Sequence, residues 1–253
     1  MVKRIQIIAA ACMATAAASA VEYNFNDYNE GPLDGQFGWN VYKNVKDSSA
    51  FSVMDAVGRT DALGDKALVL QAPEVELRSV SGEPVRWMPG ETLKVEFDFK
   101  VAITSVELVK NRPVLSVLIG DAALADKSRW EVRLEAQTNG NWRLVGDLPD
   151  WAAVEIPAQD IVARPTGDDV AISDWFRFVL TIKKGGEPDL FESTAEIKTA
   201  AGKVIATQKF TDETKDKRTA SIWNSPRVSL GFKAPRDQLG LSVIDNIRGS
   251  AAK

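Results

Sequence analysis

Alternating charged and amide side chains between residues 129 and 137 are the first candidates for chemistry in this sequence. Glu131, Arg133, Glu135 and Gln137 occupy every second position. A β-strand points alternate residues to the same side, so these four side chains would form one polar surface. The α-carbons of Glu131 and Glu135 would lie about 13 Å apart, which is long for a hydrolytic pair of carboxylates. The four groups better suit a salt-linked ladder or a floor that contacts sugar hydroxyls.

A hairpin turn at Asn139-Gly140 would place a tryptophan on the same surface. Both turn residues tolerate the positive φ that a two-residue type I′ turn requires. This turn would pair Gln137 with Trp142, and it would add Trp142 to the polar surface. The opposite, core-facing surface would carry Trp130, Val132, Leu134, Ala136 and Val145.

A flat aromatic ring beside hydrogen-bonding groups is what sugar recognition needs, because a pyranose ring stacks on an indole. Trp142 is the first choice among the seven tryptophans, followed by Trp151 in the Pro-containing segment 147–174 and by Trp87 before Pro89-Gly90. Most tryptophans in a β-sandwich belong to the core. We expect that of Trp39, Trp130 and Trp175. The candidate ligand-binding residues are therefore Trp142, Arg133, Glu135, Gln137, Glu131, Trp151 and Trp87.

The composition excludes several catalytic classes from the mature chain. The sequence contains no histidine, and its only cysteine is Cys12. Thiolate chemistry and the usual histidine or cysteine zinc sites are therefore not expected. A polysaccharide lyase would need tyrosine as its base, and the three tyrosines, Tyr23, Tyr28 and Tyr42, all lie near the N-terminus.

The positioning elements are predicted to be strands. Six apolar residues alternate with polar or small ones over 93–103, which is typical of a strand with one buried side. Similar short runs occur at 67–70, 114–119, 130–137, 142–146, 176–182, 191–199, 204–208, 228–232 and 241–247. Apart from short helical turns near 122–127 or 212–217, no helix of ordinary length is expected. The prediction is a single all-β domain over 21–253, an antiparallel β-sandwich of two curved sheets.

Residues 1–20 are predicted to be a secretory signal peptide. Lys3 and Arg4 precede an apolar stretch, and Ala18-Ser19-Ala20 is a typical cleavage site. A lipid on Cys12 is the weaker alternative, since no leucine stands three residues before it. Cleavage after Ala20 removes two of 31 basic residues, which leaves 29 against 35 acidic ones and a charge of −6.

The expected location is therefore the periplasm, the cell surface or the exterior. The acidic balance disfavours nucleic acid as a partner, and no later apolar run reaches the roughly 20 residues of a membrane helix.

Both ends of the mature chain resemble the concanavalin A-like lectin and glucanase superfamily, with a LamG-like jelly roll. Residues 23–39, with Gly38-Trp39 at their end, look like the opening strand and turn of bacterial members. Residues 243–248 resemble the final strand, and residues 175–182 a middle strand that follows a tryptophan. The resemblance implies a jelly roll whose first and last strands are neighbours, with a concave sheet that many members offer to sugars.

The resemblance also suggests two sites to examine. Laminarinase-type members carry Glu-x-Asp-x-x-Glu on one strand, and Glu96-Phe97-Asp98 begins that pattern, but Val101 stands where the third carboxylate belongs. Asp245 resembles an aspartate that holds a structural calcium ion. Asp27 or Asn24 could complete such a site if the terminal strands pair. Asp245 could equally cap a bend by accepting bonds from backbone amides.

A non-catalytic carbohydrate-binding or cell-surface interaction module is the favoured function, with a polysaccharide or other glycan as partner. The alternatives are a polysaccharide-active enzyme, a lyase before a glycoside hydrolase, and an envelope structural protein without a glycan ligand. Fold cannot separate them, because the same architecture serves all three. The sequence leaves open which glycan is bound and how many chains associate.

Overall fold

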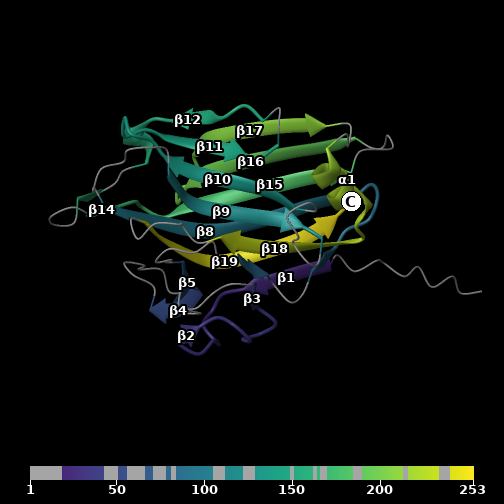
Figure 1. The fold of residues 1–253 in the computed structure, drawn as a ribbon, viewed down its shortest axis with the longest axis horizontal. Helices are drawn as coiled ribbons and strands as arrows, with labels where there is room; N and C mark the ends of the chain where they lie inside the picture. The colour runs from purple at the N-terminus through teal and green to yellow at the C-terminus, as the bar shows by residue number, and fades with distance from the viewer. Residues whose placement is uncertain are drawn as a thin grey trace, which may run out of the picture.

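The chain forms two antiparallel β-sheets that pack face to face (Figure 1). This is a computed structural model, and it describes residues 19–42, 51–55, 66–70, 78–80, 84–104, 112–121, 129–148, 151–161, 164–165, 170–184, 190–212, 216–233 and 240–253. The predicted signal peptide and the predicted helical turn at 122–127 lie outside these residues, except for Ser19 and Ala20.

The larger sheet has eleven strands within the described residues. Its main path is β17 (Val204–Asp212), β16 (Phe191–Thr199), β15 (Phe176–Lys184), β8 (Thr92–Thr104), β19 (Gly240–Ala252), β5 (Lys66–Leu70), β4 (Phe51–Asp55) and β2 (Gly31–Pro32). Beside this path lie β1 (Ser19–Tyr23), which pairs with β19, and β13 (Arg164–Pro165), which pairs with β14 (Val170–Ile172). The first and last strands are therefore neighbours, as the resemblance implied.

The smaller sheet has eight strands in the described part of the chain. Its path is β12 (Val154–Ile156), β11 (Trp142–Gly146), β10 (Arg129–Ala136), β9 (Arg112–Gly120), β18 (Arg227–Lys233), β6 (Arg78–Val80) and β3 (Asn40–Tyr42). A short strand, β7 (Val85–Arg86), pairs with the beginning of β18.

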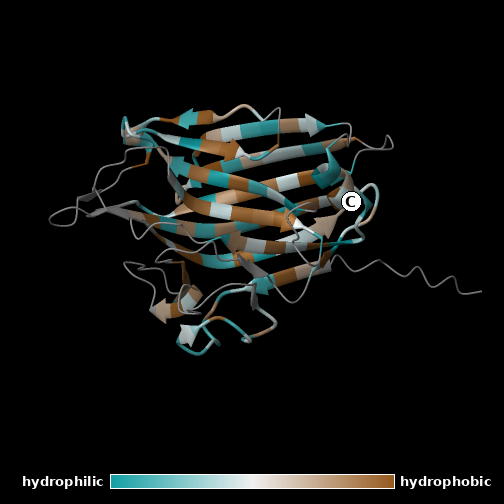
Figure 2. Ribbon diagram, in the orientation of Figure 1, coloured by the Kyte–Doolittle hydropathy of each residue, from teal (hydrophilic) through white to brown (hydrophobic). Residues whose placement is uncertain are grey.

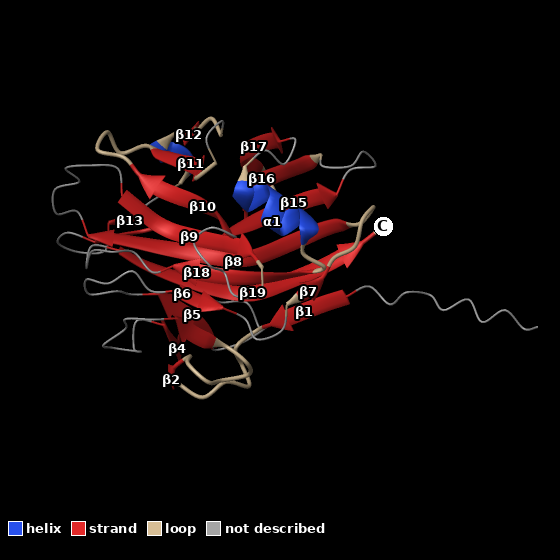
Figure 3. Cartoon of the chain, turned by 45° about the vertical axis from the view of Figure 1, so that its right-hand side comes forward, coloured by secondary structure: helices blue, strands red, loops and turns tan. Residues whose placement is uncertain are grey.

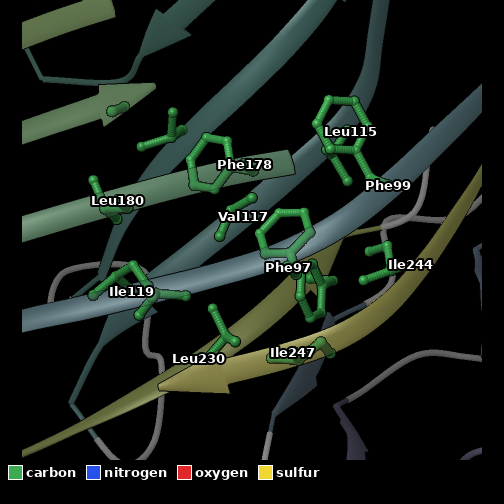
Figure 4. Packing of buried hydrophobic residues seen from close by; sticks show 14 of the residues in the cluster. Phe97, Phe99, Leu115, Val117, Ile119, Phe178, Leu180, Leu230, Ile244 and Ile247 are labelled. Carbon is green, nitrogen blue, oxygen red and sulfur yellow. The ribbon is translucent and has the colours of Figure 1, made fainter. Parts of the chain in front are cut away.

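The core lies between the sheets because both carry one apolar side. Hydrophobic and hydrophilic positions alternate along the strands (Figure 2). Phe97 of β8 stacks on Phe178 at a centroid distance of 5.0 Å and meets Phe232 of the other sheet edge-on at 5.3 Å. Figure 4 shows this packing around Phe97, with Val117 and Ile119 from the smaller sheet. The predicted all-β sandwich is confirmed.

Two predictions about irregular segments need correction. A helix of two turns, α1 (Lys217–Asn224), closes one end of the sandwich (Figure 3), where only a turn near 212–217 was expected. The Asp216 side chain caps it by accepting a hydrogen bond from the Arg218 amide. The segment 147–174, where no strand was predicted, contains β12, β13, β14 and a 3₁₀ turn, η2 (Ala158–Asp160).

Candidate binding site on the smaller sheet

The outward-facing side chains of β9, β10, β11 and β18 form the candidate site, which we call the polar face. The expected alternation along β10 is confirmed: Trp130, Val132, Leu134 and Ala136 are buried in the core, so the intervening residues point outward. Pairing extends this face sideways. Arg133 lies opposite Ser116 on β9, and Ser116 lies opposite Lys233 on β18.

The polar face is buried to an unusual degree for the solvent side of a sheet. Glu131 and Glu135 each expose 4% of their surface, and Ser229 exposes 1%. On the larger sheet, Glu196 is half-buried and Lys183 is exposed, whereas Asp98 on the same side is buried. The long side chains of Arg133, Arg143 and Lys233 lie against the two glutamates and contribute to their burial.

Glu135 organises one half of the polar face. Its Oε2 accepts a hydrogen bond of 2.7 Å from Nε of Arg143 on the neighbouring strand, and a second guanidinium nitrogen of Arg143 lies at 2.6 Å. Arg133 approaches the other carboxylate oxygen to 3.2 Å, close enough for an ion pair. The carboxylate thus holds two guanidinium groups side by side, each on a side chain that is 29% exposed.

Glu131 organises the other half. Its Oε2 lies 3.4 Å from Nζ of Lys233, across the intervening strand β9. Its Oε1 is buried and has no hydrogen-bond partner among the described residues, and the same holds for Oγ of Ser229. Buried oxygens without partners are costly, so the two are ready to bond a ligand that reaches them.

Asp147 follows β11 and lies directly beside Glu131. Its carboxylate accepts a 3.0 Å hydrogen bond from the Glu131 amide and forms a 3.0 Å ion pair with Arg218 of α1. Burial raises the pKa of the Asp147 carboxyl, against the opposite effects of that hydrogen bond and of Arg218. The same guanidinium lowers the pKa of Asp216, chiefly through side-chain hydrogen bonding. Arg218 therefore fixes the end of the polar face to α1.

The predicted hairpin exists, but its register was wrong by one residue. Gly140 has a φ of +84°, and Gln137 accepts its amide in a three-residue turn over 138–140. Trp142 consequently lies opposite Ala136 and not opposite Gln137. A slip of one residue changes the side of a strand, so Trp142 lies in the core, 4% exposed, and not on the polar face.

The other two tryptophan candidates are also buried. Trp151 packs between Trp130 and Phe210 and is 6% exposed. Trp87 has no exposed surface; its indole nitrogen donates to the Glu91 carbonyl, and the ammonium group of Lys184 lies 4.4 Å from its ring. The described outward-facing residues of β9, β10, β11 and β18 include no aromatic side chain. The expected stacking platform is therefore missing from this part of the site.

Expectations for the remaining residues are met in part. Arg133, Glu135, Glu131 and Gln137 do lie together on one side of β10, with Gln137 8% exposed. Trp39 and Trp130 belong to the core, as expected. Trp175 differs, because it is half-buried and packs on a small apolar cluster of Ala67, Val69 and Val243 apart from the main core.

The two acidic residues of the partial Glu-x-Asp pattern face outward from the larger sheet. Glu96 forms an ion pair with Lys94. Asp98 is 8% exposed and accepts hydrogen bonds from Arg177 and from the Asn246 amide side chain. These contacts agree with a structural part for both, although Asp98 is more buried than a solvated strand residue.

Of the predicted calcium ligands, Asp245 belongs to β19, and Asn24 and Asp27 follow β1, which pairs with β19 as far as Tyr23 and Ile247. Asp245 is 2% exposed, and its carboxylate accepts a 2.7 Å hydrogen bond from the Asn246 amide at a bulge where φ of Asn246 is +49°. It therefore caps a bend, as the alternative interpretation held. Asn24 and Asp27 are exposed just after β1. Among the described residues there is no cluster of three acidic, histidine or cysteine side chains suited to a metal. Calcium binding stays a prediction.

The fold is that of the concanavalin A-like lectins. Peanut lectin, solved with a nine-residue peptide, superposes with a TM-score of 0.52 at 12% identity, covering 93% of this chain and 98% of the lectin. Lectin I-B4 of Griffonia simplicifolia, in its metal-free form, gives 0.54 at 11% identity, covering 92% and 100%. A carbohydrate esterase of the Shiga toxin-encoding bacteriophage phi24B gives 0.52 at 11% identity, covering 93% and 100%.

These likenesses establish a shared jelly roll and nothing finer, since all three identities are low. No protein-family model matches the sequence, and no curated protein matches it either. Among the described helices, none is long and apolar enough to cross a membrane.

Proposed function

We propose that this chain is an exported, non-catalytic carbohydrate-binding or cell-surface interaction module that holds a glycan on the polar face. The observation that carries the proposal is two buried oxygens on the solvent side of the smaller sheet, Glu131 Oε1 and Ser229 Oγ, which have no hydrogen-bond partner within the described part of the chain. Sugar hydroxyls both donate and accept hydrogen bonds, so they suit a carboxylate and a serine hydroxyl equally.

The contacts of Glu135 favour binding over hydrolysis. A glycosidase needs one carboxyl group as acid and a second as base or nucleophile. Glu135 is held between the guanidinium groups of Arg133 and Arg143. These contacts occupy the carboxylate oxygens that would have to exchange a proton. Glu135 is therefore suited to position the two arginines.

A lyase is also disfavoured by the tyrosines. Tyr23 and Tyr28 are buried in the aromatic cluster around Trp39, where the Tyr28 hydroxyl accepts a bond from the Trp39 indole nitrogen. A base must reach the sugar proton within hydrogen-bond distance. The third, Tyr42, belongs to β3, but its side chain lies outside the described positions.

The experiment is a glycan array followed by calorimetry on each glycan that binds. Glu131→Gln keeps the shape of the side chain but weakens it as an acceptor, so the affinity should fall about tenfold, the equivalent of one charge-assisted hydrogen bond. Glu196→Gln is the matched control, because Glu196 faces outward from a strand of the other sheet. Its affinity should equal that of the wild type.

Product analysis on the same mixtures separates the alternatives. New reducing ends or unsaturated-uronate absorbance would show turnover, and the protein would then be an enzyme and not a non-catalytic binding module. If no glycan binds, the proposal is wrong and the alternative of an envelope structural protein without a glycan ligand is favoured.

A further inference from the structure

We infer that the glycan held on the polar face is anionic, with carboxylate or sulfate groups that are recognised by arginine. This inference rests on the proposed function and adds the chemical class of the ligand. It follows from the distribution of charge, from the arrangement of Arg133 and Arg143, and from a second arginine pair at the end of the same side of the sheet.

The outer side of the smaller sheet carries an excess of positive charge, although the whole chain has a formal charge of −4. Within the described strand residues of β7, β9, β10, β11, β12 and β18, the outward-facing cations number six and the carboxylates three. The cations are Arg86, Arg129, Arg133, Arg143, Arg227 and Lys233, and the carboxylates are Glu131, Glu135 and Glu155. Asp147, just beyond β11, is balanced by Arg218.

The arginine pair on Glu135 is prepared for a planar anion. A guanidinium group has five N–H donors, and those not directed at Glu135 remain for another acceptor. Both side chains keep 29% of their surface exposed, whereas the Glu135 side chain keeps 6%. The buried Glu135 carboxylate thus fixes the orientation of two guanidinium groups whose side chains are more exposed to solvent. Arginine binds carboxylate and similar oxyanions through two parallel hydrogen bonds.

A second pair extends the positive surface toward the other end of the sheet. Arg227 of β18 lies directly opposite Arg86 of β7, and both residues are exposed. Two guanidinium groups on adjacent strands can bind one oxyanion through charge-assisted hydrogen bonds. A polymer with a charge on each repeating unit could contact both pairs at once.

The test compares anionic polysaccharides with forms of the same polymer in which the charge is masked. Three suitable pairs are polygalacturonate and its methyl ester, hyaluronate and its carboxyl-reduced form, and a sulfated galactan and its desulfated form. Affinity electrophoresis and calorimetry at low and at moderate salt give the ratio of affinities. In at least one pair the anionic form should bind at least about tenfold more tightly, and added salt should reduce this ratio.

Arg143→Gln should remove most of that ratio, because it should weaken binding of the anionic form far more than binding of the masked polymer. Arg248→Gln is the control, because Arg248 is exposed on β19 of the other sheet, where it pairs with Glu22. Circular dichroism confirms that each variant is folded.

The inference is overturned if no anionic form binds more tightly than its masked form. If masked and neutral glycans bind equally well and Glu131→Gln still weakens them, the proposed function stands and the anionic class alone is wrong. If no glycan binds in any form, both are wrong.

Discussion

Arg143 on β11 reaches across to Glu135 on β10 with two nitrogens, at 2.7 Å and 2.6 Å from the same carboxylate oxygen. The two residues are direct partners in the β10–β11 ladder. Because Glu135 is buried, this contact is shielded from competing water. It fixes the hairpin side of the polar face and, with it, the orientation of the groups offered to a ligand.

Glu135→Gln should therefore lower both stability and affinity. The free energy of unfolding is expected to fall by about 1–3 kcal/mol, the range for a hydrogen bond to a charged group. Urea denaturation monitored by tryptophan fluorescence gives this value. The matched control is Glu192→Gln, whose 3.9 Å contact with Lys183 joins two well-exposed side chains. It should cost less than about 1 kcal/mol. Equal losses in the two variants would contradict the organising role of Glu135.

Trp142→Ala should destabilise the fold without a specific effect on binding. The indole is in the core, so its removal leaves a cavity and is expected to cost about 3–5 kcal/mol. Met54→Ala, at a residue that is 50% exposed, should change stability by about 0.5 kcal/mol or less. Calorimetry below the unfolding transition then decides the role of Trp142. A large loss of glycan affinity in a Trp142→Ala variant that is still folded would show that Trp142 contributes to binding.

The case of Trp142 shows which features can be predicted from sequence. The side to which each residue of β10 points depends on alternation within that strand alone, and the expectation for Glu131, Arg133 and Glu135 was correct. The side of Trp142 depended also on the length of the turn. One residue more in that turn moved the indole from the polar face to the core.

Long-range pairing and burial were beyond sequence reasoning for a different reason. Alternation over 93–103 identifies a strand but not its partners, and β8 pairs with β15 and β19 from distant parts of the chain. Ser229 and Lys233 joined the candidate site only through the pairing of β18 with β9. In sequence, Glu131 looks like any solvated residue of a strand, because its burial depends on what surrounds the sheet in three dimensions.

The two aspartates that contact Arg218 should affect stability with opposite dependence on pH. The pKa of Asp147 is raised above its ordinary value of 3.8, so the folded state binds more protons there, and stability falls as the pH rises through the interval above 3.8. The pKa of Asp216 is lowered, so its contribution is present above 3.8 and is lost as the pH falls through the lowered value.

Urea denaturation of Asp147→Asn and Asp216→Asn between about pH 3 and pH 7 tests this difference. Relative to the wild type, the free energy of unfolding of Asp147→Asn should increase as the pH rises, because the variant lacks the penalty of a buried charge. The free energy of unfolding of Asp216→Asn, again relative to the wild type, should decrease over the same range. Parallel pH profiles for the two variants would contradict the assignment of opposite shifts.

Gly146→Ala should destabilise the protein, because the position has no room for a methyl group. A Cβ built on Gly146 would lie 2.2 Å from the Trp151 ring, and that ring is packed against Trp130 and Phe210. Neither the strand nor the indole can move far, so we expect a loss of about 1–3 kcal/mol. Gly202→Ala is the control: its φ of +84° is strained for alanine, but no atom lies within 4 Å of its Cβ position, so about 1 kcal/mol is expected.

A double variant identifies the cause of the Gly146→Ala loss. Trp151→Leu removes the atoms that the new methyl group would strike, so adding Gly146→Ala to it should cost clearly less than in the wild type. The coupling free energy between the two substitutions should reach about 0.5–3 kcal/mol, as found for residues in contact. Additive losses would mean that Gly146 is required for its backbone and not for its contact with Trp151.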